Sequence, residues 1–383
     1  MIPFHKPNIP DNFEEIFSES IQKGWLTTGS RVDEFEKLLS TYLDSKYVVA
    51  VNSCTAALHL ALAAKGFGSD DKFIAPTLTF AATVECGEYL GMEPILVDCE
   101  NDGFLINLNH LEDILKSDKS IKVVIPVHYA GESVNLEELW FLAEKYNLFI
   151  LEDAAHGLES YSGKTKIGNT NFAAAFSFYA NKNLTTGGEG GALTTNDYNL
   201  AKKVKKLSLH GITKDGWNRY RNKGNWEYDI VELGYKYNLT DLAASYGVWQ
   251  MRSINIWRNR RKELVNKYKK GLSCLDSIIL PKINPGHALH LFVIRIVANK
   301  WSISRDELIN KLNEKGIGVA VHYKPIHQLS YYKKKYNYDK SQFPNSNALF
   351  KSIISLPLYP NLSNESVKYI INSIVELSKL FVK

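Results

Sequence analysis

Tyr47-Val-Val-Ala-Val51, followed after a short turn by Thr55-Ala-Ala-Leu-His-Leu-Ala-Leu-Ala-Ala64, is the stretch that decides the fold. The first run is apolar and rich in β-branched residues, which predicts a buried strand, and the second consists of strong helix formers. A strand that leads through a short turn into a helix is the beginning of a β-α-β unit. The stretch therefore predicts an α/β sheet whose strands run largely parallel.

The same alternation continues over residues 35–200. We expect six more strands, at residues 73–75, 94–97, 123–127, 148–151, 173–178 and 191–195, and helices at 109–116 and 136–146. With the first strand, these make a mostly parallel sheet of seven strands sandwiched by helices. The fold class is therefore α/β, with a large domain at residues 1–250.

A different pattern begins near residue 250. A long helical pattern over 249–272 leads to two strand-like runs, 290–297 and 317–322, and to a helical stretch at 365–380. These predict a small α+β domain at residues 251–383. Residues 214–236 carry aromatic and charged clusters without periodicity, which predicts a long functional loop.

Composition excludes several classes of protein. The chain has 383 residues, 45% of them hydrophobic, and lacks the eighteen-residue apolar run of a membrane span, so we expect a cytoplasmic protein with no membrane contact. A net charge of +5 is too mild to indicate nucleic-acid binding. The cysteines, Cys54, Cys86, Cys99 and Cys274, have no metal-type or redox-type spacing, which predicts buried free thiols and no metal site.

One lysine lies between an apolar strand and a glycine-rich turn, in Phe176-Ser-Phe-Tyr-Ala-Asn-Lys182-Asn-Leu-Thr-Thr-Gly-Gly-Glu-Gly-Gly191. A lysine amine attacks carbonyl carbon when its surroundings lower its pKa, and burial does this. Lys182 is therefore a candidate Schiff-base residue. The alternative is that it begins an ordinary solvated loop.

Three further positions match the needs of one cofactor. Ser53 and Thr55 lie at the start of the first helix, where free amides bind a phosphate, although a plain N-cap has the same residues. Phe80 follows a short strand and could cover a flat ring, or it could be a core residue. Asp153 ends a buried strand, where open α/β sheets bind ligands, although a helix cap is the alternative. With Lys182, these describe pyridoxal 5'-phosphate held by phosphate, ring face, ring nitrogen and aldehyde carbon, and Ser177 could add a hydroxyl to the phosphate.

With these motifs, the sequence resembles the DegT/DnrJ/EryC1/StrS family of sugar-nucleotide aminotransferases, which have the type I fold of pyridoxal-phosphate enzymes. The resemblance runs through nearly the whole chain and is carried, beside the lysine segment, by residues 24–29, 53–60, 126–131, 152–156, 210–211, 234–241 and 318–322. Within the family the chain is most similar to enzymes that aminate C4 of UDP-linked 4-keto sugars, such as those of 4-amino-4-deoxy-L-arabinose and pseudaminic acid synthesis.

The resemblance implies a role for each matching position. Lys182, Asp153 and His156 would be catalytic, with His156 near the phenolic oxygen of the cofactor. The cofactor would also be held by Ser53, Cys54, Thr55, Ala56, Phe80 and Ser177, and by Asn238 reaching from the neighbouring subunit of a homodimer with shared active sites. Substrate contacts would come from Trp25, Thr27, Thr28, Tyr129, His210, Tyr237 and His322.

The implied activity is transfer of an amino group, from glutamate as donor, to the C4 keto carbon of a nucleotide sugar, for bacterial surface glycan or lipopolysaccharide synthesis. Alternatives are a C3 aminotransferase acting on a dTDP- or GDP-sugar and a non-catalytic regulator that binds a sugar nucleotide. A related dehydratase would carry histidine in place of Lys182.

Three features depart from the family pattern. Gly187-Gly188 lengthens the turn, Cys54 stands where glycine or alanine is usual, and Asn238-Leu239 replaces an arginine and a methionine. Arg258, Arg260 and Arg261 are further candidates to hold an anionic substrate.

Overall fold

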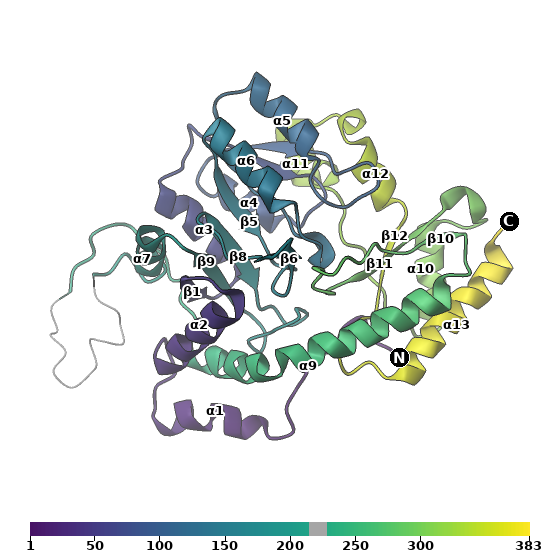
Figure 1. The fold of residues 1–383 in the computed structure, drawn as a ribbon, viewed down its shortest axis with the longest axis horizontal. Coiled ribbons are helices and arrows are strands. Elements are labelled where there is room, and N and C mark those ends of the chain that lie inside the picture. Colours follow the sequence, from purple (N-terminus) through teal and green to yellow (C-terminus); the bar gives the residue numbers. More distant parts are fainter. Residues whose placement is uncertain (214–227) are drawn as a thin grey trace.

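The computed structural model describes residues 1–213 and 228–383. Its central sheet has seven strands in the order β1-β9-β8-β5-β4-β2-β3 (Figure 1). Their bounds are β1 (Tyr47–Val51), β2 (Lys72–Pro76), β3 (Glu93–Val97), β4 (Ile121–Val124), β5 (Phe149–Asp153), β8 (Ala173–Ser177) and β9 (Gly191–Thr195). Only β9 runs antiparallel to its neighbours, β1 and β8, and the remaining pairs are parallel. The predicted α/β sheet is confirmed.

Side chains alternate between the two faces of this sheet, because successive residues of a strand point in opposite directions. In β2, Ile74 packs into one core while Phe73 and Ala75 pack into the other. The first core is shared with α2 (Ser30–Leu43), α5 (Leu108–Ser117), α6 (Leu136–Tyr146) and the first half of α9 (Asp241–Leu272), and the second with α3 (Cys54–Lys65), α4 (Ala82–Glu88) and α7 (Tyr198–Leu207). Helices thus cover both faces, as a mostly parallel sheet requires.

A second, antiparallel sheet follows in the order β10-β11-β12, with bounds β10 (Ile278–Ile279), β11 (Phe292–Ile296) and β12 (Ile353–Leu356). It shares a core with α10 (Arg305–Glu314) and α13 (Asn364–Phe381). The strand predicted at 317–322 is wrong. Ile317 and Ala320 make only single bridges, to Ile2 and to Ser355, so two different partners divide this segment and no ladder forms.

The remaining elements are short and lie around the two sheets. They are α1 (Phe13–Gln22), α11 (Ser330–Tyr336), α12 (Pro344–Phe350), the hairpin of β6 (Tyr161–Ser162) and β7 (Thr165–Lys166), and the 3-10 turns η1 (Tyr129–Gly131), η2 (Ala298–Lys300), η3 (Ile326–Gln328) and η4 (Lys340–Gln342).

Helix α9 joins the two sheets as one continuous element of 32 residues (Figure 1). It begins earlier than the predicted 249, at a cap where the Thr240 side chain accepts a hydrogen bond from the Ala243 amide. The helix runs through the predicted domain boundary at 250/251, and the division into two domains stays a prediction. The chain's start pairs with the smaller region, since the Ile2 amide donates to the Gly316 carbonyl at 2.7 Å.

Among the described residues no helix has the length and apolarity needed to cross a membrane. Cys54, Cys86 and Cys99 are buried free thiols, as predicted. Cys274 was expected to be buried too but is exposed, because it lies in the turn that follows the last residue of α9.

Candidate active site

Lys182 lies in the loop after β8, half-buried, with its amide donating to the Tyr179 carbonyl at 3.0 Å. Burial lowers the pKa of its amine to about 8, and the nearby Cys54 and Asp153 offset part of this effect. An amine with this pKa is unprotonated in a sizeable fraction of molecules near neutral pH, as a nucleophile or base requires. The alternative of a solvated loop lysine does not fit this environment.

The turn after Lys182 is closed by its own hydroxyl groups. Thr185 donates to the Phe178 carbonyl at 3.0 Å, and Thr186 donates to the Glu189 carbonyl at 2.7 Å. Gly187 has a φ of +94°, which a side chain would disfavour. The two glycines at 187–188 are therefore accommodated inside a hydrogen-bonded turn.

Asp153 is the last residue of β5, and its carboxylate is held from two sides. Its Oδ1 accepts from the Ala155 amide at 3.1 Å, and its Oδ2 accepts from the Thr83 hydroxyl at 2.6 Å. Thr79 lies 2.7 Å from Thr83 and donates to it, because the Thr83 proton is already given to the carboxylate. Sequence reasoning missed Thr83, since nothing in its own segment marks it as a partner of Asp153.

The start of α3 forms the expected anion site. The Ser53 hydroxyl caps the helix by accepting from the Ala56 amide at 3.0 Å, and the amides of Cys54 and Thr55 have no acceptor within the helix. Gly191 allows β9 to approach closely, since a Cβ there would lie 2.3 Å from the Ser53 carbonyl carbon. Ser177 pairs with Gly191 across the sheet, so its hydroxyl lies on the same edge as this helix start.

Phe80 is not a core residue, because 60% of its side chain is exposed. Its carbonyl accepts from the Thr83 amide at 3.2 Å, so the ring lies just before the helix turn that carries the Asp153 partner. The ring of Tyr323 lies 5.8 Å from that of Phe80, measured between centroids. An exposed aromatic face beside a fixed carboxylate suits a flat, heterocyclic ligand.

His156 is buried, and both of its ring nitrogens are engaged. Nδ1 accepts from the Ala130 amide at 3.2 Å, and Nε2 lies 3.0 Å from the Tyr323 hydroxyl. Burial, and then the charge of Lys182, lower its pKa well below the ordinary value. The ring is therefore a neutral imidazole.

Three more histidines surround Lys182, and sequence reasoning had included only one of them, His322. The His290 ring lies 4.4 Å from that of His156 at a tilt of 45°, and its Nδ1 lies 3.1 Å from the Asn183 side-chain oxygen. Burial lowers the pKa of His290 well below the ordinary value. Burial also lowers the pKa of His5 and of His322 to about 4. These rings are therefore neutral and add no positive charge next to the lysine.

The predicted substrate residues separate into two groups. Tyr129 and His322 lie together behind His156: the Tyr129 hydroxyl, fully buried, donates to the His322 carbonyl, and His322 Nδ1 lies 2.8 Å from the Ser355 hydroxyl. Tyr129 thus fixes the backbone that carries Tyr323.

The second group lies at the end of β1. The Asn238 amide donates to the Thr28 hydroxyl at 2.7 Å, and Thr28 donates to the Leu239 carbonyl at 2.6 Å. Two more members lie beside them: the Thr27 carbonyl accepts from the Asp241 amide, and the Trp25 indole donates to the Thr28 carbonyl. The last two contact aromatic neighbours: the Tyr237 hydroxyl bonds to the His59 ring, and the His210 amide donates to the Tyr235 carbonyl. The structure therefore joins Trp25, Thr27, Thr28 and Asn238 into one cluster.

The three arginines of α9 do not form an anion site. Arg261 is fully buried in an ion pair with Glu159, and Arg258 donates to the carbonyls of Glu159 and His287. Arg260 donates to the carbonyls of Pro360 and Leu362. These side chains are instead engaged with a carboxylate and with carbonyl groups of their own chain. Most of the 214–236 loop, residues 214–227, lies outside the described residues.

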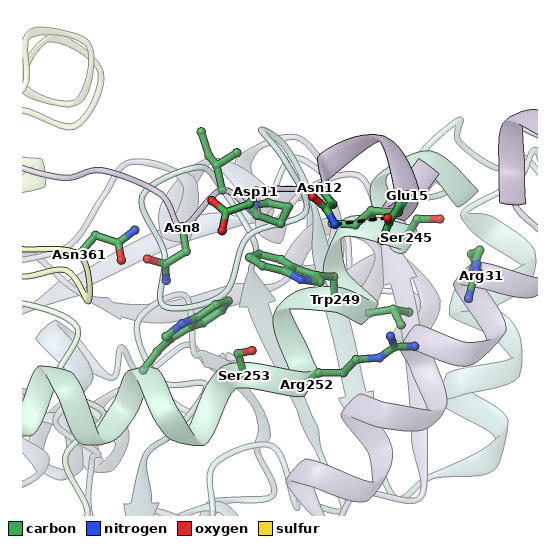
Figure 2. Close-up of a pocket in the computed structure, with 15 residues that line it drawn as sticks. Asn8, Asp11, Asn12, Glu15, Arg31, Ser245, Trp249, Arg252, Ser253 and Asn361 are labelled. Carbon is green, nitrogen blue, oxygen red and sulfur yellow. Dashed lines mark hydrogen bonds between the residues drawn. The ribbon is translucent and has the colours of Figure 1, made fainter. Parts of the chain in front are cut away.

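A separate cavity of about 640 Å³ lies between the N-terminal segment and α9 (Figure 2). Asn8, Asp11, Trp249 and Arg252 line it, and none of the predicted site residues does. The Asn8 carbonyl accepts from Tyr246 and Gln250, which fixes the segment that brings His5 toward Lys182. This cavity is thus distinct from the lysine site.

The residues around Lys182 fit pyridoxal phosphate. They offer free helix amides for a phosphate, an exposed ring for a heterocycle, a fixed carboxylate for a ring nitrogen, and an amine of lowered pKa for an aldehyde.

Comparison with known proteins agrees with this fit. The model of the DegT/DnrJ/EryC1/StrS aminotransferase family matches residues 7–375. The spore coat polysaccharide biosynthesis protein SpsC of Bacillus subtilis is 38% identical over 381 residues, covering 99% of this chain and 97% of that protein.

Solved structures give the same result. Spr1654 of Streptococcus pneumoniae, in its PMP form, is 32% identical with a TM-score of 0.91, covering 99% of this chain and 100% of that chain. PseC of Helicobacter pylori, an aminotransferase of pseudaminic acid biosynthesis, is 28% identical with a TM-score of 0.90 over 99% of this chain and 100% of that chain. The chain therefore belongs to the DegT/DnrJ/EryC1/StrS aminotransferase family and is a pyridoxal-phosphate-dependent sugar aminotransferase.

Proposed function

We propose that this enzyme moves an amino group from L-glutamate to the C4 keto carbon of a nucleoside-diphosphate-linked keto sugar used in surface glycan synthesis. The observation that carries the proposal is Lys182, an amine with a pKa of about 8 beside the fixed carboxylate of Asp153. Relatives that act in spore coat polysaccharide and pseudaminic acid synthesis support the sugar and its use in surface glycans. A cytoplasmic location stays a prediction.

The cofactor would be held by residues of α3, β5 and β8 and of the loop before α4. The amides of Cys54 and Thr55, with Ser177, would bind its phosphate, and Phe80 would cover one face of its ring. Asp153, whose carboxylate is oriented by Thr83, would keep a proton on the ring nitrogen. When bound, pyridoxal phosphate supplies a ring that withdraws electrons from the carbon that loses its proton.

Lys182 would hold the cofactor at its aldehyde carbon, and its amine is the group that would accept and return a proton in the site. Because its pKa is lowered to about 8, a larger share of this amine is unprotonated near neutral pH than in an exposed lysine, and that share can accept a proton. Burial lowers the pKa of the four histidines near it, so they stay neutral and add no positive charge beside the amine. A lysine at this position argues against the related dehydratase chemistry.

A homodimer with shared sites is part of the proposal. Near His210, the described residues Ile230, Val231 and Leu233 expose large parts of their side chains, with Leu233 88% exposed. Contiguous exposed apolar residues on a monomer mark a surface that another protein covers. Asn238, close to this run, would then reach the phosphate of the partner's cofactor.

The proposal is tested by turnover with glutamate on a panel of UDP-, dTDP- and GDP-linked keto sugars, with the aminated position determined by NMR. Lys182→Ala is expected to lose turnover, while Lys164→Ala, which removes an exposed lysine, keeps it. Borohydride treatment of the wild type should leave the cofactor attached to the peptide that contains Lys182. Turnover on C3 ketones alone would overturn the C4 assignment, and full turnover by Lys182→Ala would overturn the mechanism.

A further inference from the structure

Tyr323 lies in the candidate active site, although neither its sequence context nor the family motifs had singled it out. Its hydroxyl oxygen is 3.0 Å from His156 Nε2, and its ring is 5.8 Å from that of Phe80 and 6.4 Å from that of Tyr129. The side chain is half-buried, so part of it faces the open side of the site. It thus stands between the predicted ring-covering residue and a predicted catalytic histidine.

Which group donates in the hydrogen bond between His156 and Tyr323 follows from the protonation of the other imidazole nitrogen, Nδ1. His156 Nδ1 accepts the Ala130 amide at 3.2 Å, so it carries no proton of its own. Because burial keeps the ring neutral, its single N–H is on Nε2. His156 is therefore the donor and the Tyr323 oxygen the acceptor.

The Tyr323 hydroxyl then has a proton left to give. No acceptor within the described residues takes it, since His156 is the sole hydrogen-bond partner of this hydroxyl there. Burial, and then the charge of Asp153, raise the pKa of Tyr323 above its ordinary value, so the phenol stays protonated. The result is a neutral donor whose orientation is set by the histidine behind it.

We propose that Tyr323 donates a hydrogen bond to an oxygen atom of the molecule bound at Lys182, and that His156 positions Tyr323 for this contact. The inference rests on the proposed function and adds a binding residue to it. The acceptor is a carbonyl, phenolate or carboxylate oxygen, which either the cofactor or a substrate supplies. A charged oxygen accepts a stronger hydrogen bond than a neutral one.

The first test is Tyr323→Phe, which removes only the hydroxyl and keeps the ring against Phe80. Tyr268→Phe is the matched control, because it removes a buried tyrosine hydroxyl that donates to the Pro357 carbonyl in the smaller core. Both variants are compared with the wild type for cofactor affinity of the apoprotein, for kcat/KM with glutamate and with keto sugar, and for thermal midpoint.

Loss of one such contact should cost about 10- to 100-fold. If the acceptor belongs to the cofactor, Tyr323→Phe weakens cofactor affinity by this factor and leaves kcat/KM unchanged at saturating cofactor. If it belongs to a substrate, cofactor affinity is unchanged and kcat/KM falls for that half-reaction alone. A cofactor affinity and two kcat/KM values that all stay within twofold of the wild type would overturn the proposal.

A second measurement needs neither cofactor nor activity. In ¹⁵N-labelled apoprotein, the His156 signal, assigned by its loss in His156→Gln, should show a neutral ring protonated at Nε2. Protonation at Nδ1 would reverse the hydrogen bond and overturn the inference. If no keto sugar is turned over, the proposed function fails, while cofactor affinity and this tautomer still decide the role of Tyr323.

Discussion

At the scale of single residues, the pKa of Lys182 governs the chemistry. Its value of about 8 lies well below that of an exposed lysine, about 10.4. In apoprotein, the rate at which an amine-reactive reagent labels Lys182 should therefore rise with pH and reach half its maximum near pH 8. Labelling followed by peptide mass spectrometry measures this midpoint.

Asp153→Asn offers a check on the cause. The carboxylate raises the pKa of Lys182 and so opposes the effect of burial. Removing its charge should move the labelling midpoint to lower pH, and a midpoint shifted upward would contradict the assigned electrostatics. Lys164, exposed on the hairpin loop, serves as the internal reference in the same digest.

The sequence predicted those site residues whose roles follow from their local sequence context, and it missed those whose roles depend on contacts with distant residues. Lys182, Asp153 and Ser53 follow from their own segments, because each lies at a strand end with a side chain suited to one part of the cofactor. Thr83 and Tyr323 owe their roles to contacts with residues more than sixty positions away. No local pattern records such a contact.

At the scale of elements, a buried ion pair ties α9 to the active-site loop. Arg261 is 1% exposed, and its partner Glu159 also accepts from the Asn183 side chain at 2.7 Å, directly after Lys182. Arg261→Met should lower the free energy of unfolding by about 3–5 kcal/mol, because it leaves a buried carboxylate without a counter-charge. Urea unfolding at constant pH measures this.

The double variant Arg261→Met/Glu159→Gln separates the charge effect from packing. Since no unpaired charge is then left in the interior, we expect it to recover most of the lost stability. Equal destabilisation of the single and double variants would show that packing around Arg261, and not the unpaired carboxylate, dominates.

The helices and strands differ in how clearly their sequences predict them. The seven strands of the large sheet have apolar runs that sheets covered on both faces require, and all seven were predicted. The start of α9 was placed too late, because Ser245 and Gly247 weaken the helical pattern of its first turns. The strand expected at 317–322 does not form because its two single bridges go to different partners, Ile2 and Ser355, and neither bridge extends into a ladder.

At the scale of the whole molecule, shared active sites make a prediction about mixed dimers. If Lys182 and Asn238 act in the same site from different subunits, Lys182→Ala and Asn238→Ala should complement each other. Subunits exchanged at random give one intact site in half of the dimers, so turnover should recover to about a quarter of the wild-type value. Each variant alone is the control, and no recovery after demonstrated subunit exchange would contradict sharing.

Because α9 is one unbroken helix that contacts both regions, its exact number of residues matters more for the structure than which residues it contains. Near its start the Asp241 carboxylate accepts the Val32 amide at 3.0 Å, and near its end Tyr268 stacks 4.9 Å from Phe292 of the small sheet. Deleting one residue between them would turn everything downstream by about 100° around the helix axis. His322 and Tyr323 would swing away from Lys182, so this helix tolerates exchange of residues far better than insertion or deletion.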